Sequence, residues 1–598
     1  MTTTNSRLVR LAAAGAAGIG LATANVVGQV SIAWTGAGDG TSWSDPNNWD
    51  PAVVPDNGAA TYNVTLDLTG NVFLDLDIAC TIDDLILGAN HTLKINPGHS
   101  LTVLDDAFLD GAIEVQNASF LAASPGASFG SANRSRLLAQ GGGLIRIGAT
   151  NYSSSGLVGT ATLFSAHGAG SMIDLSTLQS VSTGFNDGCC AGTNVHSIVA
   201  SADGIVDLSG VQTLLGPVNA EDRLDIVLGT DGQVLLPALQ EIGSTSAGDV
   251  RFVINVPDYT FPSLLAAADF DLLPGVGTVV FLPLLETLAK AEIVVPNDAS
   301  VSMPSVLSIT GSSISVAAGG SLSAPAASDF TGNTITIDSG QALDFPLFAT
   351  IDNSRFVVQG GSVLEVAATS YSSSGLASTQ TIIGAEGAGT LVDWSTVQSI
   401  DAGFNDGCCA GTNVHTVSAS AGAVIDLSSL QFASGPVNAE DRLEFKVASG
   451  GDIVLDALQE VDSIGAGDVR FSIEVPSFAL PSLFSASDVD LLPAAGSSLD
   501  LPSLALLNGA EVVVPSGATV LMPAVVGISN STISVGTGGT FYAPAAASFT
   551  GNVVTFDSGQ IMTLPVLGSI DASRFAVTGG SMLVVAATSY SSASLAST

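Results

Sequence analysis

Residues 502–523 read PSLALLNGAEVVVPSGATVLMP, and proline recurs at the same interval on both sides of this stretch. Each interval holds short apolar runs separated by Gly and Asn. Proline cannot donate to an inter-strand ladder, and Gly and Asn accept the positive φ of tight turns. The pattern predicts an all-β fold, a single elongated parallel β-helix with three short strands in each coil of ~21 residues. The prolines of the two ladders are Pro262, Pro283, Pro304, Pro325 and Pro346, then Pro481, Pro502, Pro523, Pro544 and Pro565.

A second, longer repeat contains these coils. NYSSSG at 151–156 recurs as SYSSSG at 370–375, and the segment Phe185 to His196 recurs as Phe404 to His415, with the same offset both times. The spacing of the ladder positions predicts nine coils per repeat, which is a rise of ~43 Å at ~4.8 Å per strand. The expected segments are first coils over 62–148, repeat 1 over 149–367, repeat 2 over 368–586, and the start of a third repeat over 587–598.

Charge and composition narrow the classes of partner. Lys and Arg number 14 against 54 Asp and Glu, a net charge of −40. A polyanion repels phosphate backbones, so nucleic acid is not expected as a partner. Residues 1–24 have the features of a signal peptide, since Arg7 and Arg10 precede an apolar run and Ala22-Thr23-Ala24 resembles a cleavage site. No later stretch is long and apolar enough to predict a membrane helix. The chain is therefore expected to be secreted or displayed on the cell surface.

Residues 25–61 hold three of the four tryptophans, in Trp34-Thr35-Gly36, Trp43-Ser44 and Asn48-Trp49, followed by Pro55. This segment resembles the start of secreted bacterial β-helix surface proteins of the autotransporter-passenger-like and sorting-tail-bearing kinds. The resemblance implies an exported bacterial rod. A Trp-rich cap over the first coil would protect an open sheet edge, although a small irregular N-terminal core would use the same residues.

Polar residues concentrate in loops inserted into the longer coils. Three of these loops, at 184–196, 216–223 and 247–251, recur unchanged at 403–415, 435–442 and 466–470. Because they lie on successive coils, we expect each set to stack into one ridge. Carboxylates in Gly-rich loops suit Ca²⁺, although neither an EF-hand loop nor a nonapeptide calcium repeat is present. No cofactor is required, and Ca²⁺ is the one candidate. Its candidate ligands are Asp187, Glu221, Asp222, Asp249, Asp406, Glu440, Asp441 and Asp468.

The favoured interpretation of the same loops is structural. Arg223 and Arg251 would form ion pairs with Glu221, Asp222 or Asp249 and so hold the three loops together, with Arg442 and Arg470 as their counterparts. Paired carboxylates would also suit a polysaccharide lyase or glycosidase. Nothing in the spacing fixes such a pair, so no catalytic residue is assigned.

Adjacent cysteines stand in both sets of loops, Cys189-Cys190 and Cys408-Cys409. The two pairs are separated by a whole repeat, far beyond the ~7 Å Cα limit of a disulfide. Each pair is therefore expected to form a vicinal disulfide in an oxidising compartment, with zinc bound together with His196 as the alternative. Cys80 is left over and is expected to be a small buried apolar residue.

Identical loops repeated on a rigid rod suit multivalent weak contact. The expected function is therefore that of a structural or adhesive surface protein whose partners are extracellular glycans or other surface and matrix proteins. The alternative is a β-helix that binds or degrades polysaccharide. Duplicated loops count against an enzyme, because one active site gains little from a copy several nanometres away.

Overall fold

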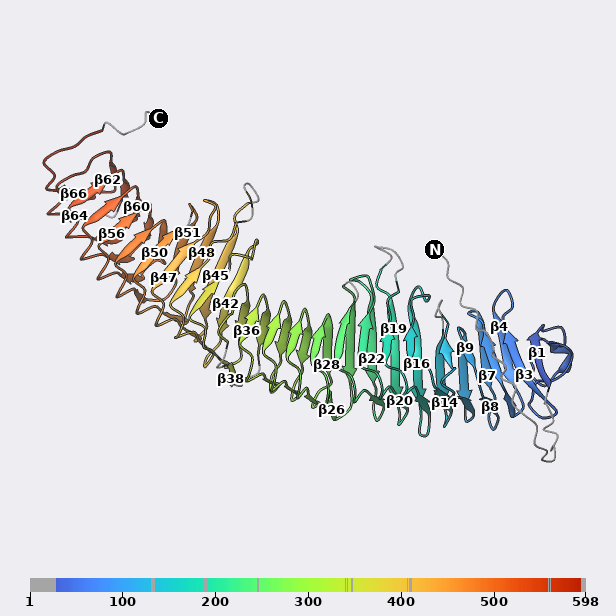
Figure 1. Ribbon diagram of the computed structural model, residues 1–598. Coiled ribbons are helices and arrows are strands. Elements are labelled where there is room, and N and C mark those ends of the chain that lie inside the picture. Colours follow the sequence, from blue (N-terminus) through green and yellow to red (C-terminus); the bar gives the residue numbers. More distant parts are fainter. Residues whose placement is uncertain are drawn as a thin grey trace, which may run out of the picture.

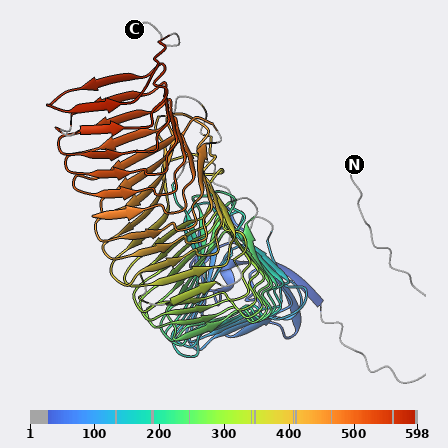
Figure 2. The same cartoon turned by 90° about the vertical axis from the view of Figure 1, so that its left-hand side faces the viewer.

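The computed structural model describes residues 28–592 apart from 131–134, 186–191, 245–246, 339, 341, 346–347, 406, 408–410, 464, 558 and 560. These residues form the strands β1 to β66 and one short 3-10 helix, η1 (Pro46–Asn48). The coils stack along a gently curved rod (Figure 1), and the view from its end shows successive strands lying above one another (Figure 2). The structure confirms the predicted parallel β-helix.

One face of the rod, face 1, is a continuous parallel sheet of 22 strands. Along most of these strands buried residues alternate with outward ones, because successive side chains of a strand point to opposite sides of a sheet. The strands of face 1 are β4 (Val72–Leu76), β7 (His91–Ile95), β10 (Ala112–Gln116), β13 (Arg136–Gln140), β16 (Ala161–His167), β19 (Val195–Ser201), β22 (Arg223–Leu228), β25 (Asp249–Ile254), β28 (Phe270–Pro274), β31 (Glu292–Val295), β34 (Ser313–Val316), β37 (Thr334–Ile337), β39 (Arg355–Val358), β42 (Gln380–Glu386), β45 (Val414–Ser420), β48 (Arg442–Val447), β51 (Asp468–Ile473), β54 (Val489–Pro493), β57 (Glu511–Val514), β60 (Thr532–Val535), β63 (Val553–Phe556) and β65 (Arg574–Val577).

The other two faces consist of several shorter parallel sheets. Face 2 has a seven-stranded sheet that ends at β23 (Gln233–Leu235), and the next sheet begins at β26 (Asp258–Thr260). The same break recurs in repeat 2 between β49 (Asp452–Val454) and β52 (Ser477–Ala479). Face 3 holds two eight-stranded sheets, which begin at β15 (Asn151–Ser153) and β41 (Ser370–Ser372).

The register on face 1 gives the number of coils in a repeat. Nine successive strand pairings lead from Phe164 to Ile383, its counterpart one long repeat later. At ~4.8 Å per pairing the repeat rises by ~43 Å. Equivalent surface features of the two repeats are therefore separated by about that distance along the rod.

The prolines of the ladder lie at a corner, as their spacing predicts. In a minimal coil the amide of Val525 donates to the carbonyl of Met522 across Pro523. That places Pro523 at the second position of a β-turn, where its fixed φ is favourable and its missing N–H is not needed. Pro346 lies outside the described residues.

The other two corners use backbone with positive φ. One carries Gly517 at +68° and Gly538 at +73°, and the other carries Gly509 at +64° and Asn530 at +52°. We expect Gly517→Ala to destabilise its coil by about 1 kcal/mol, because the left-handed conformation penalises a Cβ even though space for it is open.

The matched control is Gly527→Ala on the same coil. Gly527 has no positive φ, and an added Cβ would meet only the Leu506 side chain at 3.4 Å. This change is expected to be neutral or slightly stabilising. Urea unfolding of the two variants tests the difference, and equal midpoints would show that the corner carries no strain.

A line of buried polar side chains runs along the minimal coils beside the apolar core. The side chain of Asn552 accepts from the Ser531 amide at 2.9 Å and donates to the Ile528 carbonyl at 2.9 Å, while its own amide donates to the Ser573 hydroxyl at 3.1 Å. Asn333 is bonded in the same way in repeat 1. Since both groups of the side chain are satisfied, the asparagine is buried at low cost and joins three coils.

The three N-terminal tryptophans form one buried cluster at the first end of the rod. The rings of Trp34 and Trp43 each meet Trp49 edge-on, with centroids 4.9 and 4.7 Å apart. The strand β1 (Gly28–Trp34) pairs antiparallel with β2 (Trp49–Asp50) on one side and parallel with β3 (Ala60–Leu66) on the other. The parallel stack thus begins inside the segment predicted as the cap.

Candidate functional site

Two groups of longer coils carry the predicted loops. The loops rise from the same side of the rod near β16 to β25 and again near β42 to β51 (Figure 1). We name the described residues of 184–196, 216–223 and 247–251 ridge 1, and those of 403–415, 435–442 and 466–470 ridge 2. The ridges are separated by the same nine coils that separate Phe164 from Ile383.

Backbone hydrogen bonds join the loops of ridge 1 from coil to coil. The amide of Arg223 donates to the carbonyl of Asn194, and the amide of Asp249 donates to the carbonyl of Asp222. The amide of Gly248 donates to the carbonyl of Pro217 at 3.3 Å. Gly248 permits this approach, since a Cβ there would lie 2.7 Å from the Asn219 carbonyl oxygen. The described loop segments therefore form one stacked unit.

Asp222 stabilises this stacked unit from its interior. It is fully buried, and its carboxylate accepts from the Asn194 amide at 2.9 Å and from the Asn219 side chain at 3.1 Å. Asp441 makes the corresponding bonds in ridge 2. Both carboxylates therefore act as caps for backbone and amide donors.

A buried histidine anchors the base of each ridge. His196 stacks on Phe185 with ring centroids 3.9 Å apart, and its Nδ1 lies 2.8 Å from the Ser154 hydroxyl. Its Nε2 lies 3.2 Å from the Gly159 carbonyl. Because a carbonyl can only accept, we assign the ring proton to Nε2, and the Ser154 hydroxyl then donates to Nδ1. Burial lowers the pKa of His196 to about 4.

Ridge 2 reproduces this anchor. His415 stacks on Phe404 at 3.8 Å, and its ring nitrogens lie 2.8 Å from the Ser373 hydroxyl and 3.2 Å from the Ser378 carbonyl. Burial again lowers the pKa of the imidazole to about 4. Because these serines and histidines are fully buried, the Ser–His pairs hold the fold and are closed to a substrate.

The arginines of the ridges bond to carboxylates on the strands of face 1. Arg251 donates through Nε and Nη2 to Asp271 on the next coil, at 3.0 and 2.8 Å, and Arg470 does the same with Asp490 at 3.0 and 2.7 Å. Arg223 bonds to Asp225 in its own strand at 3.0 Å. The sequence predicted Glu221, Asp222 or Asp249 as partners. The structure instead places these pairs on the sheet, where Arg251–Asp271 and Arg470–Asp490 link successive coils. Among the described residues, the buried Nε of Arg442 has no hydrogen-bond partner.

Asp249 and Asp468 lie half-buried at the start of β25 and β51. Burial, reinforced by the neighbouring carboxylates Asp271 and Asp490 respectively, raises the pKa of each to about 6. Both groups are therefore ionised at neutral pH and take up protons in mildly acidic solution.

Some of the residues predicted to bind calcium, and all of the cysteines predicted to form disulfides, lie outside the described part of the chain. Asp187, Asp406 and all four loop cysteines, Cys189, Cys190, Cys408 and Cys409, lie outside the described residues. Within the described part of the chain, no three His, Cys, Asp or Glu side chains group in a way that would hold a metal ion. Cys80 is buried, and burial raises the pKa of its thiol to about 12.

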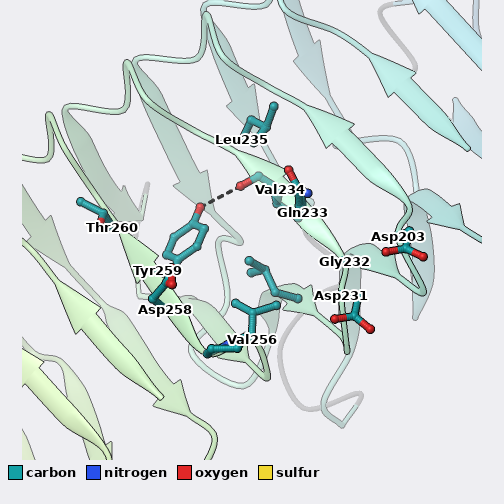
Figure 3. Close-up of a pocket in the computed structure, with 12 residues that line it drawn as sticks. Asp203, Asp231, Gly232, Gln233, Val234, Leu235, Val256, Asp258, Tyr259 and Thr260 are labelled. Carbon is teal, nitrogen blue, oxygen red and sulfur yellow. Dashed lines mark hydrogen bonds between the residues drawn. The ribbon is translucent and has the colours of Figure 1, made fainter. Parts of the chain in front are cut away.

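A cleft of about 440 Å³ opens on the coils that carry ridge 1, beyond the C-terminal ends of their face 1 strands, where face 2 is broken between β23 and β26 (Figure 3). Tyr259 bridges the break, since its hydroxyl donates to the Val234 carbonyl at 2.9 Å. Three aspartates line the rim, Asp203, Asp231 and Asp258. The counterparts of these aspartates and of Tyr259 in repeat 2 are Gly422, Gly450, Ser477 and Phe478. The cleft therefore differs in chemistry between the repeats, whereas the ridges do not.

No protein-family model, curated protein or solved structure matches this chain. Among its described residues, none belongs to a helix with the length and hydropathy needed to cross a bilayer.

Proposed function

We propose that this protein is a secreted or surface-displayed adhesive rod that makes weak multivalent contacts through its two ridges. The observation that carries the proposal is the unchanged duplication of the ridges together with their internal supports. Both copies keep the Phe–His–Ser anchor, the buried aspartate and the coil-to-coil hydrogen bonds, while the cleft on the same coils changes from aspartates to Gly and Ser. Partners of this kind would be extracellular glycans or surface and matrix proteins.

Rigid spacing supports this proposal on physical grounds. Two equal weak sites on one rod gain effective concentration when a surface presents ligands at a matching distance, here ~43 Å. A single active site gains little from the same duplication. The export signal predicted at 1–24 fits an extracellular location.

The test uses exposed alanines at the loop tips, Ala220 in ridge 1 and Ala439 in ridge 2. Full-length protein would first be screened on arrays of immobilised glycans and matrix proteins. On a dense ligand surface, Ala220→Arg or Ala439→Arg alone should weaken apparent binding by about 10-fold or more, because avidity is lost. The double variant should bind least, and the soluble monovalent ligand should bind both single variants with equal affinity.

Two results would contradict the proposal. If the double variant bound every captured ligand as well as the unmodified chain, the ridges would not be the contact surface. Release of unsaturated or reducing sugars from a captured polysaccharide would instead establish the alternative, a β-helix that degrades polysaccharide.

A further inference from the structure

A hollow of about 370 Å³ lies on the outer side of face 1 near the N-terminal end, across β4, β7, β10 and β13. Its rim carries two strongly exposed apolar side chains, Phe73 at 67% and Val158 at 66%. Its polar lining includes Asn71, Glu114 and Arg136. His91 forms part of the lining as a buried ring whose Nδ1 has no hydrogen-bond partner among the residues that the structure describes. None of the residues that line the hollow belongs to a ridge or lines the cleft of Figure 3.

Arg136 is the unusual member of this lining. It is exposed, and within the described residues its guanidinium makes no hydrogen bond or ion pair, although the chain has a net charge of −40. Its counterpart one long repeat later, Arg355, is fully engaged: Nε and Nη2 donate to the Thr334 hydroxyl at 3.0 and 2.6 Å, and Nη1 donates to the Gln380 side chain.

The difference arises from two alanines. In the register of face 1, Ala112 stands opposite Arg136 where Thr334 stands opposite Arg355. Ala161 occupies the position in repeat 1 that Gln380 occupies in repeat 2. Alanine methyl groups thus stand where the two partners of Arg355 stand in repeat 2. The Arg136 guanidinium therefore lacks these partners, and the hollow opens in front of it.

The wall of the hollow is fixed by ridge 1. Leu157, Val158 and Thr160 belong to the loop that precedes β16 and line the hollow. His196 contacts the Gly159 carbonyl of this loop, and the Val195 amide donates to the Thr160 hydroxyl at 3.2 Å. A wall held by a buried residue is preorganised, which lowers the entropic cost of binding.

We propose that this hollow binds a carboxylate-bearing sugar of one or two residues. The planar guanidinium of Arg136 matches a carboxylate with two parallel hydrogen bonds. Phe73 offers an exposed apolar surface for one face of a sugar ring, while Asn71 and Thr160 offer hydrogen bonds to hydroxyl groups. The volume lies in the range of small-ligand sites. Glu114 is the one carboxylate among the described residues of the lining, and Lys94 stands opposite it in the register.

The test measures binding of a galacturonic acid disaccharide to the full chain by titration calorimetry, with the neutral galactose disaccharide and inorganic phosphate as comparisons. Arg136→Gln should weaken binding of the acidic disaccharide by about 10-fold or more. The double variant Ala112→Thr with Ala161→Gln keeps the arginine but restores the partners seen at Arg355, and it should weaken binding equally. Glu114→Gln should strengthen it.

Arg355→Gln is the matched control and should leave binding unchanged. Thermal melts that coincide with that of the unmodified chain would show that each variant folds. Absence of saturable binding at millimolar disaccharide, or equal affinity in the unmodified chain and both Arg136-site variants, would overturn the proposal. Phosphate binding as tightly as the disaccharide would also overturn it, because the hollow would then recognise any anion. Failure of this inference is distinguishable from failure of the proposed function, since Ala220→Arg and Ala439→Arg alter the contact surface of the ridges but no residue that lines the hollow.

Discussion

Replacing Arg251 with methionine is expected to lower the local free energy of unfolding by about 3 kcal/mol. Arg251 makes two hydrogen bonds to Asp271, whose side chain is only 6% exposed. Methionine keeps much of the apolar stem but leaves the Asp271 carboxylate buried without its cation, and an unpaired buried charge is costly. Hydrogen exchange of the amides in β25 and β28, which the pair links, reports this local stability.

The chain provides its own replicate and control. Arg470→Met should cost about the same as Arg251→Met, because Arg470 bonds to Asp490 with the same geometry and similar burial. Arg146→Met should cost about 1 kcal/mol or less, since Arg146 is half exposed and its partner Asp174 also accepts two bonds from Ser176. A change below about 0.5 kcal/mol at Arg251 would show that the pair adds no stability. Equal effects at all three arginines would show that burial of the ion pair does not set its contribution.

The fold could be predicted because its rules are local and repeat along the sequence. Pro523 occupies a turn position that needs no N–H, and Gly517 and Asn530 supply positive φ at the remaining corners. Each of these requirements leaves a residue-type signature at a fixed interval. Even the nine coils per repeat follow from those intervals.

The partners of the ridge side chains were harder to predict, because they depend on register between coils of unequal length. Arg251 and Asp271 stand on successive coils and meet only because β25 pairs with β28 in a particular register. The sequence therefore pointed to the nearer loop carboxylates. The sequence did contain a sign of the correct partner, because Arg470 and Asp490 have the same separation as Arg251 and Asp271.

The hollow beside Arg136 shows a different limit of the sequence. Ala161 can be compared with Gln380 through the offset of the long repeat, but Ala112 cannot be compared with Thr334 in this way because the early coils differ in length. Only the strand register identifies both as neighbours of the arginine. Ser154 and His196 are likewise far apart in the sequence, and their recurrence as Ser373 and His415 was the one available sign of a pair.

Acid is expected to destabilise the ridges through their buried histidines, by up to about 3 kcal/mol for each. Burial lowers the pKa of His196 and His415 to about 4, whereas an unfolded histidine has a pKa near 6.5. Between these values the unfolded chain binds the proton first, so this contribution is fully present above about pH 6.5 and is lost as the pH falls toward 4. Protonation would also place a second N–H against Ser154 or Ser373, which now donate to the ring.

Protonation of Asp249 and Asp468 stabilises the folded chain as the pH falls, which opposes the effect of the histidines. Both aspartates must therefore be replaced before the destabilisation by the histidines can be measured. Their pKa is raised to about 6 in the folded protein, so the folded chain binds these protons first and gains stability as the pH falls below 6. In the double variant Asp249→Asn with Asp468→Asn, stability measured by urea unfolding should therefore fall steeply from pH 6.5 to 4.5. Adding His196→Gln and His415→Gln should flatten that slope whatever its effect on stability at neutral pH. A slope that survives loss of both histidines would assign the acid sensitivity to other groups, and the anchors of the ridges would then be insensitive to pH.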